Sequence, residues 1–420
     1  MGSSFSPFSS LFFRLTFNNM IIVCILLITT ANPVLGSYYK SIFSFGDSLA
    51  DTGNTLNNKP NAYVCRLPYG ETYFHRATGR FSDGRVVLDF IAQAVGLPLL
   101  PPYLGSSNKD LRQGMNFAVG GATALDSSFF EERKIKVVTN DSLGVQLEWF
   151  RKLLPSLCNP FSDDFHEYLK TSLILMGEIG GNDYNGPFFQ GRCLEEIRTF
   201  VPDVTKAISL AIKDLIKEGA VTFMVPGNFP IGCSALYLTL FKSPNKEDYG
   251  ESGCMKWLNA FSVYHNKFLQ KELAALRAQH PSVQIIYADY YNVAMKFYQS
   301  PELLGFKGGA LMACCRCKDP YNCNQFLQCG SVDGIVCDDP STYVNWDGIH
   351  LTEAAYKFIA DGLMQENYQF FFPNNNIITT ITTAIDRNQE LLSYRYKKRR
   401  KTMMRNILWS ICNFLHIDSA

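Results

Sequence analysis

The sequence has no apolar run long enough to cross a membrane comfortably. Its most apolar block, residues 20–30, is shorter than the roughly 20 residues that a spanning helix requires. Arg14 is the only charged residue before Lys40, and the small residues ending at Gly36 suit a signal peptidase. We expect residues 1–36 to be a cleaved signal peptide on a secretory route to the extracellular space, cell wall or vacuole, with no stable membrane insertion afterwards. The alternative is an uncleaved anchor.

An excess of one charge sign is also absent. The chain has 39 basic and 38 acidic side chains, which gives a formal net charge of +1. This balance provides no reason to expect nucleic acid or a strongly charged substrate as a partner. Aromatic residues make up 14% of the chain, which suits apolar or ring-bearing ligands but equally suits a thick core.

The 13 cysteines lack the spacing of a zinc site, because two clean Cys-x-x-Cys pairs do not occur. Cys24 lies in the expected signal peptide, so an even number remains for a chain bound for an oxidising compartment. Half of the remainder crowd into one segment, at Cys314, Cys315, Cys317, Cys323, Cys329 and Cys337. We expect disulfides there, with their pairing open, and no metal. The sequon at Asn140 predicts glycosylation on this route.

Short apolar runs of strand length alternate with segments of helical periodicity. The expected strands are residues 41–45, 115–119, 172–176, 221–225 and 283–287. The expected helices are residues 85–94, 143–154 (ended by Pro155), 204–217, 255–279 and a segment from Thr352. Strands that are apolar throughout and alternate with helices predict a parallel sheet covered on both faces.

Polar or glycine-rich turns follow the first three expected strands. Ser48 comes after the first strand, Gly121 after the second and Asn182 after the third. The carboxyl ends of parallel strands meet at one edge of the sheet, so these turns should share one rim. Each turn alone could be only a turn, and the convergence is what indicates a site.

His350 is one of six histidines and follows a carboxylate, Asp347, by three residues in a glycine-containing turn. An imidazole that acts as a general base needs a hydrogen bond to orient its second nitrogen, and Asp347 can supply it over this span. The alternative is a structural Asp–His pair that caps the following helix.

Together these residues supply the parts that acyl transfer needs. The set comprises Ser48 as nucleophile, Gly121 and Asn182 as oxyanion donors with the backbone N–H of Ser48, Asp347 as orienting acid and His350 as base. The chain lacks the Gly-x-Ser-x-Gly setting of an ordinary α/β-hydrolase. The sequence does not indicate a pair of facing carboxylates, which glycoside hydrolysis would need.

Residues 45–54, Phe-Gly-Asp-Ser-Leu-Ala-Asp-Thr-Gly-Asn, resemble the first block of the plant GDSL esterase/lipase family of the SGNH hydrolase superfamily. Residues 116–122, 180–183 and 347–350 resemble the later blocks. The likeness runs in the correct order over most of the chain, which makes it specific where each motif alone is not. Residues 316–319 depart from the glycine-rich continuation usual after Ala-Cys-Cys, which leaves the path of that loop open.

The resemblance implies a flavodoxin-like, three-layer α/β/α fold over residues 37–375, with a parallel sheet of about five strands. It also implies hydrolysis of a small-molecule or lipid ester by an acyl-enzyme on Ser48, without a cofactor. In the family, the matching glycine and asparagine, here Gly121 and Asn182, help to form the oxyanion hole. The matching Asp347 and His350 complete the triad, and we expect a monomer.

Residues 376–420 run past the length that the family needs, and we expect a disordered extension there. A basic run at residues 397–401 precedes apolar residues, so binding to an anionic membrane surface or a nuclear signal are alternatives. Two other functions remain open: a non-catalytic ligand- or carbohydrate-binding wall protein, and an acyltransferase. A pure binder need not retain Ser48, Asn182, Asp347 and His350 together, which favours the esterase.

Overall fold

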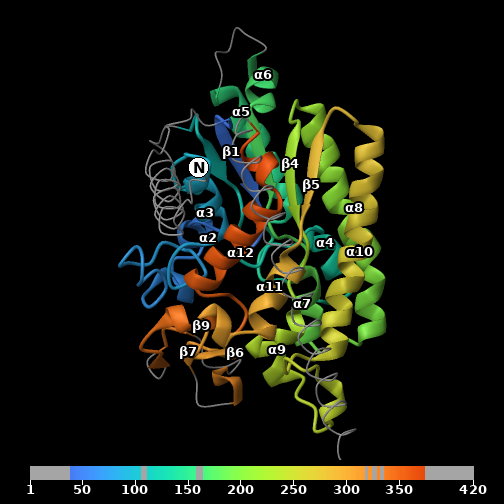
Figure 1. Ribbon diagram of the computed structural model, residues 1–420. Helices are drawn as coiled ribbons and strands as arrows, with labels where there is room; N and C mark the ends of the chain where they lie inside the picture. Colours follow the sequence, from blue (N-terminus) through green and yellow to red (C-terminus); the bar gives the residue numbers. More distant parts are fainter. Residues whose placement is uncertain are drawn as a thin grey trace, which may run out of the picture. The chain divides into compact units, whose positions relative to one another are not determined.

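The computed structural model describes residues 38–105, 111–157, 164–316, 320–323, 329–331 and 335–373 (Figure 1). The predicted signal peptide, residues 1–36, and the predicted extension, residues 376–420 with its basic run, lie outside the described residues, as do residues 317–319. In the segments that the structure covers, no helix combines the length and apolarity needed to cross a membrane.

A five-stranded parallel sheet in the order β2-β1-β3-β4-β5 organises the fold. Strands β1, β4 and β5 of this sheet are labelled in Figure 1. Its strands are β1 (Ser41–Phe45), β2 (Gly114–Asn116), β3 (Ser172–Met176), β4 (Thr222–Pro226) and β5 (Gln284–Ala288). This is the flavodoxin-like order, in which the order of successive strands reverses between β1 and β3. In sheets of this kind, ligands bind beyond the carboxyl ends of the strands at that position. The predicted fold class is confirmed.

Helices cover both faces of the sheet, which explains why β1, β3 and β4 are buried throughout. Phe43 and Phe45 point to one face, and Ile42 points to the other. The first face is covered by α5 (Leu143–Leu157), α8 (Leu194–Lys217) and α10 (Lys256–Gln279). The second face is covered by α3 (Val87–Ala94), α11 (Tyr290–Gln299) and α12 (Glu353–Glu366).

Shorter elements surround this frame. The helices are α2 (Asn54–Asn58), α4 (Ser127–Glu131), α6 (Asp164–Lys170), α7 (Asn182–Phe189), α9 (Ala235–Leu240) and α13 (Tyr368–Phe371). Strand β6 (Gly309–Ala313) pairs with β9 (Tyr343–Asn345) in parallel, and β7 (Cys315–Arg316) pairs with β8 (Ile335–Val336) in antiparallel fashion.

Three disulfides occur among the described residues, at Cys233–Cys254, Cys314–Cys337 and Cys315–Cys329. Two of them lie in the cysteine-rich segment, so the prediction of disulfides there is confirmed. Within the described ranges, no group of His, Cys, Asp and Glu side chains is arranged to hold a metal ion.

Three element boundaries differ from the sequence predictions by three residues or more. Helix α5 continues past Pro155 to Leu157, so the proline lies in the last turn and does not end the helix at the preceding residue. Helix α8 begins ten residues before the predicted start and contains Pro202, since the buried side chains of Ile197 and Phe200 extend its apolar face. Strand β2 ends at Asn116, whose side chain accepts a hydrogen bond from the backbone N–H of Ala118.

Candidate active site

The chain turns sharply between the end of β1 and Ser48. A Cβ at Gly46, where φ is +152°, would lie 3.0 Å from the carbonyl oxygen of Glu178, so this turn requires glycine. The next residue, Asp47, donates its backbone N–H to that same carbonyl (3.0 Å) and accepts the N–H of Leu49 at its carboxylate (2.9 Å). These contacts fix the turn at the carboxyl end of β1 and present Ser48 beyond the sheet.

The loop between β9 and α12 carries Asp347 and His350. The Nδ1 of His350 lies 2.7 Å from Oδ2 of Asp347, and its Nε2 lies 2.7 Å from Oγ of Ser48. The other carboxylate oxygen of Asp347 accepts the backbone N–H groups of Ile349 (3.1 Å) and His350 (2.9 Å). Ser48 and His350 are each 8% exposed, so the pair is largely desolvated. The three residues predicted as a triad therefore form one hydrogen-bonded chain.

A buried tyrosine supports the acid of this chain. The hydroxyl of Tyr69 donates to Oδ2 of Asp347 at 2.8 Å. Burial alone would raise the pKa of Asp347, but the nearby His350 and the hydrogen bonds that the carboxylate accepts lower it to about 2. Burial and the adjacent carboxylate raise the pKa of Tyr69 well above its ordinary value, so its hydroxyl stays protonated and donates. The ring of Phe81 lies 4.7 Å from the ring of His350 and covers one side of it.

The predicted oxyanion donors lie beside the Ser48 turn. The Nδ2 of Asn182, at the start of α7, donates to Oδ2 of Asp47 (3.2 Å) and to the carbonyl of Ala122 (3.1 Å). These bonds place the amide next to the residue before Ser48 and the residue after Gly121. Among the described residues, the backbone N–H groups of Ser48 and Gly121 have no acceptor within the protein.

The neighbouring glycine, Gly120, is already engaged. Its backbone N–H donates to the carboxylate of Asp51 (3.0 Å) and the hydroxyl of Thr55 (2.9 Å). Asp51 also accepts the N–H groups of Gly53 and Asn54, both at 2.7 Å. Asp51, in the second half of residues 45–54, therefore joins the start of α2 to the turn at Gly120. Among the described residues, the backbone N–H of Gly120 thus has acceptors and that of Gly121 has none.

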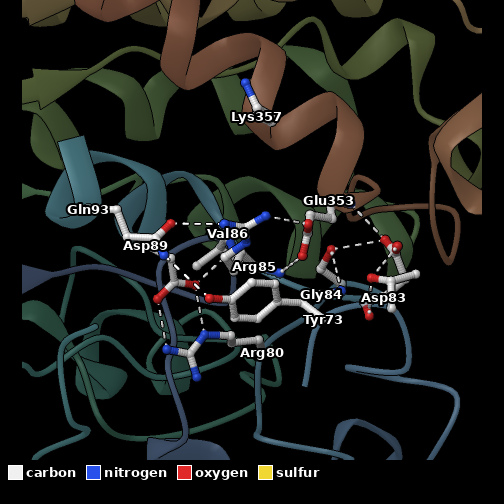
Figure 2. A network of polar contacts seen from close by, with 12 residues as sticks. Tyr73, Arg80, Asp83, Gly84, Arg85, Val86, Asp89, Gln93, Glu353 and Lys357 are labelled. Atoms are coloured by element: carbon white, nitrogen blue, oxygen red, sulfur yellow. Dashed lines mark hydrogen bonds and ion pairs between the residues drawn. The ribbon is translucent and has the colours of Figure 1, made fainter. Parts of the chain in front are cut away.

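A network of polar contacts anchors the start of α12, and with it the His350 loop (Figure 2). The carboxylate of Glu353 accepts the backbone N–H of Arg85 (2.7 Å) and pairs with its guanidinium (2.8 Å). In return, Asp83 accepts the backbone N–H of Glu353 (2.7 Å). Figure 2 also shows Arg80 and Asp89 from the adjoining segment, whose ion pair measures 2.7 Å and is almost completely buried.

Sequence reasoning missed the residues that support the site. The contact of Tyr69 with Asp347 spans 278 residues and has no local signal in the sequence. Asp47 can be recognised as a turn residue from its Gly-Asp-Ser setting, but its contact with Asn182 depends on how β1 and β3 align. The five predicted catalytic and oxyanion residues do converge. Asn140, the predicted glycosylation site, is exposed.

Several acidic groups near the site are buried and hold their protons unusually tightly. Burial raises the pKa of Asp183 to about 7 and that of Asp83 to about 6. Asp47 and Glu178 form a buried pair in which burial raises the pKa of both groups, that of Glu178 well above its ordinary value.

These carboxyl groups predict that the protein loses stability as the pH rises. A group whose pKa is higher in the folded chain contributes stability that is present below its ordinary pKa, 3.8 for aspartate, and is lost as the pH rises through 6–7. Each pKa unit corresponds to about 1.4 kcal/mol, so we expect Tm at pH 8 to lie at least about 5 °C below Tm at pH 5. Asp347 acts in the opposite direction only when the pH falls from 3.8 towards about 2.

Thermal unfolding measured by circular dichroism between pH 4 and pH 8 tests this expectation. The Asp183→Asn variant serves as a comparison, because an amide cannot ionise and should flatten the decline above pH 6. A Tm that rises from pH 5 to pH 8 in the unmodified protein would contradict the assignment.

Comparison with known proteins identifies the family. Residues 42–363 match the GDSL-like lipase/acylhydrolase family. The chain belongs to this family. A GDSL esterase/lipase of Arabidopsis thaliana is 53% identical over 334 residues, which cover 79% of this chain and 85% of the relative. A second one from the same plant is 52% identical over 353 residues, covering 83% and 87%. A sinapine esterase of Brassica napus is 52% identical over 337 residues, covering 79% and 86%.

Membership of the GDSL family confirms the resemblance drawn from the four sequence blocks. It also confirms the prediction of a carboxylic ester hydrolase. The match begins inside β1 and ends inside α12, so it includes every predicted catalytic and oxyanion residue of this GDSL chain.

Proposed function

We propose that this protein hydrolyses small-molecule carboxylic esters through an acyl-enzyme on Ser48. One observation carries the proposal: His350 bridges Oγ of Ser48 and the carboxylate of Asp347, with both contacts at 2.7 Å. An imidazole held in this way can accept a proton from the hydroxyl and bear the resulting positive charge beside an ionised acid.

In the first half of the reaction, Oγ of Ser48 attacks the carbonyl carbon of the ester while His350 removes the hydroxyl proton. The carbonyl oxygen becomes an oxyanion, which accepts hydrogen bonds from the backbone N–H groups of Ser48 and Gly121 and from Nδ2 of Asn182. Collapse of this intermediate breaks the ester C–O bond, and His350 passes its proton to the departing alcohol. A water molecule, deprotonated by His350, then attacks the acyl carbon. The bond between this carbon and Oγ of Ser48 breaks, His350 returns the proton to Oγ, and the acid is released. Asp347 orients the imidazole throughout.

The amide of Asn182 can serve the oxyanion because its present contacts are long. The two bonds that it donates, to Asp47 and to the carbonyl of Ala122, measure 3.2 and 3.1 Å. An oxyanion is a stronger acceptor than a backbone carbonyl, so it competes successfully for one of the two amide hydrogens.

The substrate is proposed to be an ester with an apolar or aromatic acyl group. The ring of Phe81 against His350 supplies an apolar surface beside the reacting atoms. The relative from Brassica napus is, by its name, an esterase of sinapine. We extend to this chain only the broader class, a small-molecule ester, and propose acyl transfer to an alcohol other than water as the second candidate, because the same acyl-enzyme would serve it.

We further propose that the chain is secreted after removal of residues 1–36, and that the hydrolase domain spans residues 37–375. The three disulfides support an oxidising compartment. The exposed side chain of Asn140 supports glycosylation there.

A fluorophosphonate probe tests the proposed function directly. The probe phosphonylates a serine only where a base activates it, so the expected result is a single label on Ser48 after peptide mapping. Pre-incubation with p-nitrophenyl acetate should slow the labelling, because the ester occupies the same site. A label on another serine, or none, would favour a binding protein that keeps the scaffold without turnover. An acyltransferase would show the same label but would form a new ester when an alcohol is added.

A further inference from the structure

Helix α9 contacts the loop that carries the triad acid and base. The hydroxyl of Ser234, just before the helix, donates to the carbonyl of Gly348 at 2.5 Å, and the backbone N–H of Leu236 donates to the same carbonyl at 2.9 Å. Gly348 lies between Asp347 and His350 in the sequence. The position of α9 is therefore tied to that of the imidazole.

The same helix also reaches the other side of the site. The hydroxyl of Tyr237, the third residue of α9, donates to Oδ1 of Asn185 at 2.6 Å. The Nδ2 of Asn185 in turn donates to Oδ1 of Asn182 at 3.2 Å. The two asparagines lie one turn apart on α7, so their side chains meet on one face of that helix.

This chain of hydrogen bonds determines which way the amide of Asn182 points. Its Oδ1 accepts from Asn185, while its Nδ2 donates to Ala122 and Asp47. A flipped amide would set Oδ1 against the carbonyl of Ala122 and the carboxylate of Asp47, and would bring two NH₂ groups together. Both changes are repulsive, so the chain favours the orientation that directs amide hydrogens toward the Ser48 turn.

Tyr237, the first donor in this series of hydrogen bonds, is itself held rigidly. Tyr237 is 2% exposed, and its ring packs against Phe188, Phe189 and Phe241. A hydroxyl in such surroundings needs an acceptor, and Asn185 provides it. The orientation of Asn185 is thus set by a side chain that has little freedom to move.

We propose that Tyr237 and Asn185 are positioning residues that orient Asn182 for stabilisation of the oxyanion. This inference rests on the proposed function, in which Asn182 is an oxyanion donor. In this proposal both residues act through Asn182 and not on the substrate itself. Their effect is to keep one amide hydrogen of Asn182 available, and α9 links that hydrogen to the loop of the general base.

The Tyr237→Phe variant removes one oxygen atom and leaves the packing in place. We expect kcat for p-nitrophenyl acetate to fall about 2- to 12-fold, the range for one neutral hydrogen bond, with KM unchanged. A matched control is Tyr39→Phe, since the buried hydroxyl of Tyr39 donates to the carbonyl of Phe370 at 2.6 Å, away from the site. The control should lose a similar amount of Tm and keep its kcat.

The Asn185→Asp variant provides a second, sharper test. A carboxylate still accepts from Tyr237 but presents only oxygen to Oδ1 of Asn182, which drives that amide to flip. We expect kcat to fall about 10²-fold, close to the effect of losing an oxyanion donor. An Asn185→Asp protein that folds and retains its kcat would overturn the proposal.

A double-mutant cycle separates positioning from a general loss of stability. If Tyr237 acts through Asn182, the Tyr237→Phe change should lower kcat in the unmodified protein but not in the Asn182→Ala background. An equal fall in both backgrounds would overturn the positioning role, as would an Asn182→Ala variant with full kcat. Failure of the proposed function itself looks different, because the unmodified protein would then neither hydrolyse the ester nor take up the fluorophosphonate label on Ser48.

Discussion

The Ser48→Ala variant is expected to lose about 10⁶-fold in kcat for p-nitrophenyl acetate, as removal of a catalytic serine does in other hydrolases. The reason is that no other hydroxyl can take its place: Oγ of Ser48 is the atom that His350 contacts with Nε2. Without this hydroxyl no acyl-enzyme can form, and the ester can be hydrolysed only by direct attack of water. The oxyanion donors alone leave a small residual rate.

The loss of kcat identifies Ser48 as the nucleophile only if the Ser48→Ala variant is folded and free of active contaminants. The variant should keep its Tm within a few degrees, because Ser48 lies on a turn that is fixed by the backbone of Asp47 rather than by the hydroxyl. Steady-state rates should be normalised to fluorophosphonate-reactive sites in the unmodified enzyme. Activity within tenfold of the unmodified protein would exclude Ser48 as the nucleophile.

The Asp347→Asn variant should lose about 10⁴-fold in kcat, an effect that arises from the wrong tautomer of the base. At present Oδ2 of Asp347 faces Nδ1 of His350 at 2.7 Å, so Nδ1 carries the proton and Nε2 is free to accept one from Ser48. An asparagine can turn its NH₂ group toward Nδ1, which places the proton on Nε2. The imidazole then donates to Ser48 instead of accepting from it.

The matched control is Asp361→Asn, the same substitution on the exposed side of α12, where the carboxylate pairs with Lys357. It should leave kcat and KM unchanged. For Asp347→Asn, KM should remain close to its original value while kcat falls across the whole pH range. A fall confined to acidic pH would mean that Asp347 acts through its charge on protein stability and not by orienting His350.

The fold was accessible from the sequence because its strands are apolar on both faces and its rim turns are polar. Those two signals place Ser48, Gly121 and Asn182 at one edge of a parallel sheet without knowledge of any loop. The start of α8 was not accessible, since Pro202 suggests a break that burial of Ile197 and Phe200 overrides.

The residues that support the site could not be predicted from the sequence for a different reason. Tyr69 and Tyr237 act through single hydrogen bonds to partners 278 and 52 residues away. Such contacts depend on the path of irregular segments, which carry no periodicity. Asn185 lies in the same short helix as Asn182, but its proposed role follows only from its hydrogen bonds with Tyr237 and Asn182 in the structure.

The distance along the chain between Ser48 and His350, 302 residues, has a consequence for biosynthesis. The ribosome makes the proposed nucleophile near the beginning of the domain and the proposed base near the end. Until the segment from Asp347 to Glu353 has emerged and docked against Asp83 and Arg85, Ser48 has no partner to accept its proton. By the proposed mechanism, a nascent chain is therefore inactive toward esters. Hydrolysis begins only when almost the whole domain has been synthesised and has folded.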